Sequence, residues 1–147
     1  MNALGLALIK EAEGCRLGAY RCPAGKWTIG YGHTAGVYPG MKITKKEALA
    51  LLESDLIKYE GIIKSLVKGN ISSNQEAALV SLCFNIGETA FRKSTLLKLV
   101  NQGLYLEASE QFIKWCKVNK QVSEGLFNRR LKEKALFNLT EKEPTNV

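Results

Sequence analysis

The chain contains a single histidine, three prolines and no apolar run close to the length of a membrane span. A membrane-spanning helix needs about 20 predominantly apolar residues, so we expect no stable insertion into a membrane. One histidine leaves no histidine pair for a metal site, and the four cysteines show no Cys-x-x-Cys spacing. These absences argue against a zinc site, and we expect no metal.

The N-terminal stretch MNALGLALIKEAEG lacks the basic segment with which a secretory signal peptide begins. Its apolar part is interrupted by Lys10 and Glu11. We therefore expect a helix here and no signal peptide.

The chain has 147 residues and a net charge of +7, without internal repeats or a Pro/Ser-rich linker. This length is typical of one compact domain, which can have two lobes. The positive charge favours anionic partners, although an ordinary solvated surface explains it equally well. A basic nucleic-acid module is one alternative. However, the lysines and arginines are scattered through every predicted helix without a recognition motif, so we expect no nucleic-acid partner.

The apolar periodicity predicts a mostly helical α+β fold with one small N-terminal β-sheet. Thr44 and Glu47 form a predicted capping box before a long helix that stops at Gly69-Asn70, and SNQE at 73–76 forms a second. The long helix is expected to connect two lobes, and the helix that follows it to be central and buried. The expected helices cover residues 2–12, 44–68, 73–86, 94–102, 105–117 and 124–138.

Residues 19–41 alternate and turn, which is typical of a β-hairpin. Trp27, Ile29 and Tyr31 are expected on one side of a strand, and Thr28 on the other, polar side together with two glycines. Among the cysteines, Cys83 and Cys116 are expected to pack as small hydrophobic residues. Cys15 and Cys22 are close in sequence, and a disulfide between them is left open.

Glu13 ends the first predicted helix immediately before Gly14. The negative end of the helix dipole disfavours a carboxylate there, so the protonated form is available as a general acid. An ordinary surface glutamate in a frayed last turn is the alternative. Cys22 and Thr28 follow within 15 residues, and a tight hairpin can bring them to the same cleft. A carboxylic acid facing a water held by a thiol and a hydroxyl resembles an inverting glycoside hydrolase whose second carboxylate is replaced.

Three segments, in this order, resemble the phage-type lysozymes (endolysins) of glycoside hydrolase family 24. They are EG at 13–14 with AYRCPAGKWTIGYGHT at 19–34, FNIGETAFRKSTLLKLVN at 84–101, and GLFNRRLKE at 125–133. The resemblance implies one lysozyme-like domain over residues 1–147. Its β-containing lobe would cover about 14–60, and its helical lobe about 61–140 plus the helix at 2–12. It also implies hydrolysis of the β-1,4 bond between N-acetylmuramic acid and N-acetylglucosamine in peptidoglycan, without a cofactor.

The resemblance assigns roles residue by residue. Glu13 takes the position of the catalytic glutamate and Thr28 that of the catalytic threonine, while Cys22 stands where the family most often has aspartate. Further positions are implied in support: Gly32, His33, Phe84 and Asn85 for substrate binding, and Arg129 near the catalytic glutamate. Core packing of Phe84, a purely structural role of His33 and a surface position of Arg129 are the alternatives.

The cysteine at position 22 leaves three mechanisms open. An unperturbed thiol has a pKa of about 8.5 and is a weaker base than aspartate at neutral pH. Cys22 can position water together with Thr28, attack the sugar as a thiolate in a retaining route, or be inert. In the last case the protein only binds peptidoglycan. We expect the water-positioning enzyme, because Glu13, Thr28 and the late arginine are all present.

The resemblance also implies where the protein works. We expect a monomer that accumulates in the host cytoplasm and is released by a separate membrane-permeabilising protein, a holin. It would then act on the cell wall in the periplasm.

Overall fold

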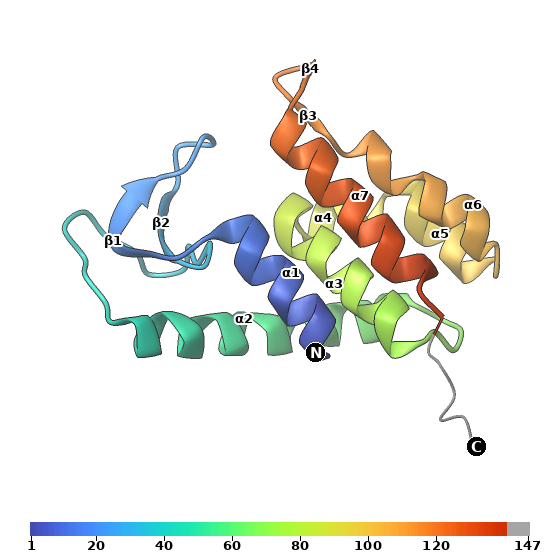
Figure 1. The fold of residues 1–147 in the computed structure, drawn as a ribbon, viewed down its shortest axis with the longest axis horizontal. Coiled ribbons are helices and arrows are strands. Elements are labelled where there is room, and N and C mark those ends of the chain that lie inside the picture. Colours follow the sequence, from blue (N-terminus) through green and yellow to red (C-terminus); the bar gives the residue numbers. More distant parts are fainter. Residues whose placement is uncertain (141–147) are drawn as a thin grey trace, which may run out of the picture. The chain divides into compact units, whose positions relative to one another are not determined.

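The computed structural model describes residues 1–140, which form two compact units (Figure 1). One unit contains residues 1–8 and the chain from Tyr59 onward, and the other is Ile9–Lys58. Both boundaries fall inside helices, α1 (Ala3–Glu13) and α2 (Lys45–Leu66). None of the helices within residues 1–140 is long and apolar enough to cross a membrane.

The larger unit is helical and is built around α3 (Ser73–Ile86) and α7 (Glu124–Asn138), which lie side by side in Figure 1. As expected, α3 is central: all residues from Ala77 to Cys83 are buried. Burying an aliphatic side chain such as Leu79 contributes about 1.5–3 kcal/mol. The remaining elements of this unit are α4 (Glu88–Arg92), α5 (Thr95–Asn101), α6 (Tyr105–Glu110), a 3₁₀ turn η1 (Phe112–Lys114), β3 (Lys117–Val118) and β4 (Gln121–Val122).

The first helix begins in the larger unit and ends in the smaller one. Near its start, Gly5 lies so close to Ala77 that a Cβ atom on the glycine would be 2.7 Å from the alanine Cβ. Near its end, Lys10 lies over the ring of Tyr31, 5.7 Å from the centroid. The boundary between the two units falls within this helix, after Leu8.

The smaller unit holds an antiparallel hairpin of β1 (Arg16–Arg21) and β2 (Trp27–Gly30). Tyr20 lies opposite Thr28, and an irregularity in the register separates this pair from Arg16, which lies opposite Gly30. The side of the strand that carries Thr28 and the glycines is covered by other residues. Thr28 is only 3% exposed, and Gly30 is buried against Ala48 of α2.

The predicted helix starts are nearly right. Thr44 and Glu47 form the expected reciprocal capping box, with both bonds at 3.1 Å. The second box lies one position earlier than expected, between Ser72 and Gln75. Glutamine serves as well as glutamate at the third helical position, so two adjacent serines made the sequence ambiguous.

One helix predicted from the sequence is shorter than expected, and the expectation of a single sheet is wrong. The helix expected over 105–117 ends at Glu110 and is followed by the 3₁₀ turn η1 and then by the β3–β4 hairpin. Its turn residues, Asn119 and Lys120, both have positive φ, at 50° and 68°. A two-residue hairpin turn of this kind favours Asn-Gly. Because a lysine occupies the second position, the sequence did not indicate the turn. The short helix α4 was not predicted either.

Candidate active site

Glu13 is the last residue of α1, and its carboxyl group lies against the backbone of Gly32. The helix stops because Gly14 adopts a positive φ of 65°, which glycine tolerates best. Gly32 has a φ of 72°, and a Cβ atom there would lie 2.6 Å from Glu13 Oε1. Only a residue without a side chain therefore allows the half-buried carboxyl group its position.

Cys22 and Thr28 lie on either side of the hairpin turn. The Cys22 amide donates to the carbonyl of Lys26 at 2.9 Å, and the Gly25 amide donates to the carbonyl of Cys22 at 2.8 Å. The Thr28 hydroxyl donates to the same Lys26 carbonyl at 3.0 Å. These bonds hold the sulfur and the hydroxyl on the same side of the turn.

The turn favours the thiolate form of Cys22. Its pKa is lowered chiefly by a hydrogen bond from the Lys26 backbone, with further bonds from the Ala24 backbone and the Thr28 side chain. Desolvation acts in the opposite direction but is outweighed. The sulfur is partly exposed, so a thiol with enhanced acidity faces the solvent beside a hydroxyl group.

The phenol of Tyr20 responds to the charges of both Glu13 and Cys22, and sequence reasoning missed this residue. Burial raises the pKa of Tyr20 most, the negative charge of Glu13 raises it further, Arg16 lowers it, and Cys22 adds a smaller increase. Each of these charges must therefore lie near the phenol. Alternate residues of a strand share a face, so a tyrosine two positions before Cys22 was the available clue.

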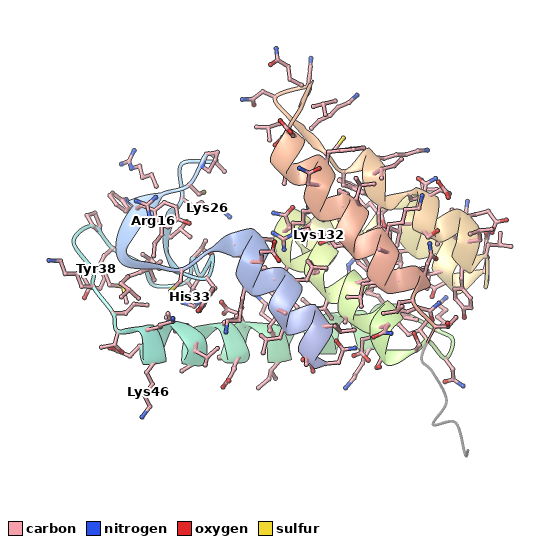
Figure 2. The ribbon with its side chains drawn as sticks, viewed as in Figure 1. Arg16, Lys26, His33, Tyr38, Lys46 and Lys132 are labelled. Carbon is pink, nitrogen blue, oxygen red and sulfur yellow. The ribbon has the colours of Figure 1, made fainter. Side chains whose placement is uncertain are left out.

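The chain around these groups is strongly basic. All six charged residues between positions 14 and 46 are Lys or Arg, so the rest of the chain, with 15 basic and 14 acidic residues, is nearly neutral. Arg16 stacks over Tyr20 with its guanidinium carbon 4.1 Å from the ring centroid, and Arg21 lies 5.2 Å from that of Trp27. Figure 2 labels Arg16 and Lys26 on this unit. The smaller unit thus offers a positive surface beside Glu13.

His33 uses both ring nitrogens for bonds within its own unit. Nδ1 lies 2.7 Å from Asp55 Oδ2 on α2, and Nε2 lies 2.8 Å from the carbonyl oxygen of Ala35. The side chain therefore ties the segment after β2 to the long helix. Its predicted sugar contact would have to use the ring carbons, because the nitrogens are occupied.

The four cysteines are free thiols. Cys15 precedes β1 and Cys22 follows it, so an extended strand of seven steps separates them by about 20 Å. A disulfide requires Cα atoms within about 7 Å, which excludes the pairing that the sequence left open. Cys83 and Cys116 are buried as expected, and burial raises the pKa of Cys83 to about 12. Residues 1–140 contain no group of three or more His, Cys, Asp or Glu side chains that could hold a metal ion.

The other predicted site residues belong to the helical unit. Phe84 packs edge to face with Tyr59, with ring centroids 5.2 Å apart, while Asn85 is exposed at the end of α3. Arg129 is only 7% exposed, so it is not on the solvent face of α7.

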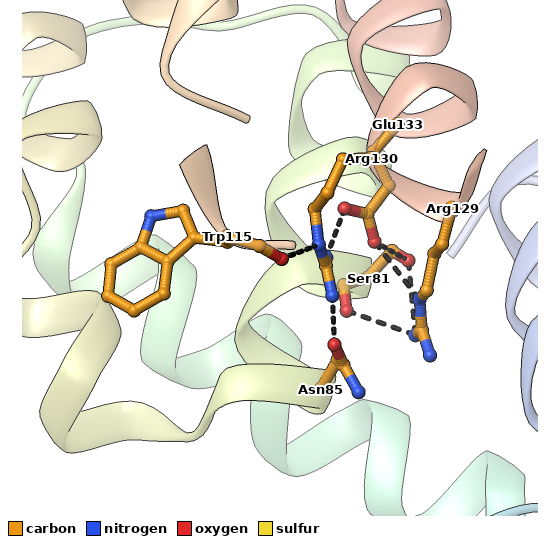
Figure 3. A network of polar contacts seen from close by, with 6 residues as sticks. All are labelled: Ser81, Asn85, Trp115, Arg129, Arg130 and Glu133. Carbon is orange, nitrogen blue, oxygen red and sulfur yellow. Dashed lines mark hydrogen bonds and ion pairs between the residues drawn. The ribbon is translucent and has the colours of Figure 1, made fainter. Parts of the chain in front are cut away.

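Arg129 belongs to a buried network of polar side chains, shown in Figure 3. The fully buried Glu133 accepts from Arg129 Nε at 3.3 Å, from Arg130 Nη1 and from the Ser81 hydroxyl. Arg130 continues the network, since its Nε donates to the Trp115 carbonyl at 2.8 Å and its Nη2 donates to Asn85 Oδ1. Buried ions are tolerated when they are paired and hydrogen-bonded in this way.

Sequence reasoning named Arg129 and Asn85 but missed Arg130 and Glu133, the two residues that link them in the network. The spacing was the available clue, because Glu133 lies four residues after Arg129 and three after Arg130. Side chains at these distances meet on one face of a helix.

Comparison with known proteins gives consistent results. A family model described as phage lysozyme matches residues 10–133. The chain is 48% identical over 137 residues to the endolysin of Acyrthosiphon pisum secondary endosymbiont phage 1, covering 90% of this chain and 94% of that protein. It is 42% identical over 142 residues to the endolysin of Salmonella phage P22, covering 93% and 97%.

Among solved structures, the muramidase domain of SpmX from Asticcacaulis excentricus superposes with a TM-score of 0.88 at 40% identity. That match covers 95% of this chain and 97% of the other. The lysozyme-like α+β fold expected from the sequence is thereby confirmed. With a family match over most of its length and relatives of similar size well above 30% identity, the chain belongs to the phage lysozyme family of glycoside hydrolases.

Proposed function

We propose that this family member hydrolyses the β-1,4 bond between N-acetylmuramic acid and N-acetylglucosamine in peptidoglycan. Glu13 acts as the general acid that protonates the leaving oxygen. Cys22 and Thr28 position the water that attacks the sugar. The proposal rests on one observation above all: Gly32, two residues after β2, receives the Glu13 carboxyl group against its backbone, so the acid lies against the segment that continues the hairpin bearing Cys22 and Thr28.

Each group has a defined chemical task. A positioned general acid contributes typically 10²–10⁴-fold in rate, and Gly32 leaves room for the carboxyl group that supplies this proton. The lowered pKa of Cys22 increases the fraction of the sulfur that is thiolate near neutral pH, and the thiolate is the form that accepts a hydrogen bond from the attacking water. The Thr28 hydroxyl, bound at the same turn, orients that water from a second direction.

The test of this assignment is Glu13→Gln, assayed by clearing of purified peptidoglycan and by mass spectrometry of the products. We expect the variant to lose turnover and the wild type to release hydrated ends, which exceed the anhydro ends of a transglycosylase by one water. A lytic Glu13→Gln protein would contradict the acid assignment. Anhydro products would contradict the hydrolytic reaction.

The lowered pKa of Cys22 also supports a second route, in which the thiolate attacks the sugar and forms a covalent intermediate. The two routes differ in stereochemistry, because direct attack by water inverts the anomeric centre and a covalent intermediate retains it. NMR of the first product formed distinguishes them. We propose inversion. A product that keeps the β-configuration, together with a trapped adduct on Cys22, would contradict inversion and support the covalent route.

A protein that binds peptidoglycan without cleaving it is the remaining alternative. Binding of the wild type to sacculi without release of reducing ends would select it. The basic smaller unit suits an anionic cell wall in either case.

We propose further that the protein reaches the wall from the host cytoplasm with the help of a holin. Expression in Gram-negative cells tests this step. Lysis is expected only after the inner membrane is permeabilised, and spontaneous lysis would contradict the proposed release.

A further inference from the structure

The β3–β4 hairpin extends beyond the start of α7 at one end of the helical unit (Figure 1). All residues from Lys117 to Val122 are exposed, and two of them are valines. Val118 is 44% exposed and Val122 is 64% exposed. Two β-branched apolar side chains on one short hairpin are thus in contact with solvent.

The hairpin is held at its base by hydrogen bonds to the rest of the helical unit. The Ser123 amide donates to the carbonyl of Cys116 at 2.7 Å, and Cys116 is buried. The Ser123 hydroxyl accepts from the Leu126 amide at 3.3 Å and caps α7. These bonds fix the direction in which the tip of the hairpin points, so the valines are presented by a folded element.

The register of the hairpin places both valines close behind its turn. Val118 lies opposite Gln121, directly before the turn at Asn119-Lys120. Val122 lies opposite Lys117, one residue further from the turn. Adjacent strand residues are about 3.4 Å apart along the strand and point to opposite faces. A flat layer that receives the tip therefore meets both valines at nearly the same depth.

The charge around the hairpin is predominantly positive. Between positions 111 and 123 the chain has three lysines and neither aspartate nor glutamate. All three lysines are exposed; they are Lys114, Lys117 and Lys120. Of the flanking acidic residues, Glu110 is paired with Lys134 at 3.1 Å, and Glu124 contributes one negative charge at the start of α7. The local charge therefore complements an anionic partner.

We propose that the tip of this hairpin docks on a lipid surface that carries anionic phosphate headgroups. The two valines enter the boundary between headgroups and acyl chains, and the lysines lie at the level of the phosphates. Long lysine side chains suit this arrangement, because the stem covers apolar surface while the ammonium group stays among polar groups. This shallow, reversible attachment differs from a membrane span, and it goes beyond the proposed hydrolysis.

The valines distinguish a lipid surface from a soluble polyanion. Lysines attract either partner, because the attraction depends on charge. An exposed valine contributes to binding only where its apolar surface is removed from water. A soluble polyphosphate has no apolar interior, whereas a lipid layer has one directly beneath its phosphates.

Binding of the full chain to lipid vesicles tests the proposal. Co-sedimentation compares vesicles of phosphatidylglycerol and phosphatidylcholine with vesicles of phosphatidylcholine alone. We expect binding to the anionic vesicles only, weakened by added salt, because salt screens exposed charges. Lys120→Gln should weaken partitioning about fivefold, equivalent to about 1 kcal/mol. Lys93→Gln removes the same charge from an exposed position after α4, and this control should weaken partitioning less than about twofold.

Val122→Ser tests the apolar contribution. It should weaken partitioning into anionic vesicles at least about threefold and leave binding to soluble polyphosphate unchanged. Leu106→Ser, at a 68% exposed position on α6, is the matched control and should change neither. Urea midpoints near that of the wild type establish that both serine variants are folded.

Three results would overturn the inference. One is the absence of wild-type binding to anionic vesicles. Another is equal weakening by Lys120→Gln and Lys93→Gln, which would show that net charge acts without a defined surface. The third is wild-type partitioning of Val122→Ser, which would replace the lipid surface by a soluble polyanion. Vesicle binding is measured without peptidoglycan, so these outcomes are independent of the proposed function.

Discussion

Replacing Gly32 by alanine should displace the Glu13 carboxyl group and reduce activity far more than stability. The new Cβ would lie 2.6 Å from Glu13 Oε1, whereas ordinary contacts begin at 3.4 Å. The carboxyl oxygen must therefore move by about 0.8 Å. A misplacement of about 1 Å can cost 100-fold in rate, so we expect kcat/KM to fall by about 10- to 100-fold.

Gly36→Ala is the matched control for this substitution. Gly36 has a φ of 70°, nearly the same as the 72° of Gly32, but a Cβ atom there would meet nothing within 4 Å. Both variants should lose about 1–2 kcal/mol of stability from the left-handed backbone. Only Gly32→Ala should lose activity.

The assay measures kcat/KM on purified peptidoglycan together with the free energy of unfolding in urea. Equal activity of the two alanine variants, at equal stability, would refute the reasoning that Gly32 exists to accommodate Glu13. A loss of activity that merely follows the loss of folded protein would refute it as well.

Three further predictions concern the buried network and the cysteines. Glu133→Gln should lower the free energy of unfolding by about 3 kcal/mol, because it leaves two buried guanidinium groups without their carboxylate. The control Glu110→Gln, which breaks an exposed pair with a lysine, should lower it by less than about 1 kcal/mol. Equal urea midpoints of the two variants would contradict this. Cys22→Asp should keep lytic activity, and Cys22→Ser should reduce the rate at which purified peptidoglycan is cleared by at least tenfold. A fully active serine variant would remove the sulfur from the mechanism. Because its pKa is lowered, Cys22 becomes a thiolate at lower pH than a free thiol. At pH 7, iodoacetamide should therefore alkylate Cys22 faster than it alkylates N-acetylcysteine, as followed by peptide mass spectrometry. Buried Cys83, with a pKa of about 12, should stay unmodified.

Local signals in the sequence were sufficient for several features. The buried run of α3 has no polar face, so it predicted a central helix, and Thr44 with Glu47 marked the start of α2 because both partners of a capping box lie within one turn. The catalytic candidates followed from a helix end, a hairpin and a resemblance of motifs in the right order. Features that depend only on residues a few positions apart can be predicted from the sequence in this way.

The tertiary structure decided what depends on distant parts of the chain. Thr28 is buried because other segments cover the strand, and folding brings the backbone of Gly32 against the carboxyl group of Glu13, 19 positions earlier. The direction of the Asn85 amide is set by a guanidinium group 45 positions away. A sequence pattern shows which chemical groups are available. The burial of each group and the direction of its hydrogen bonds depend on residues that are distant in sequence but close in the fold, and these two properties give the site its chemistry.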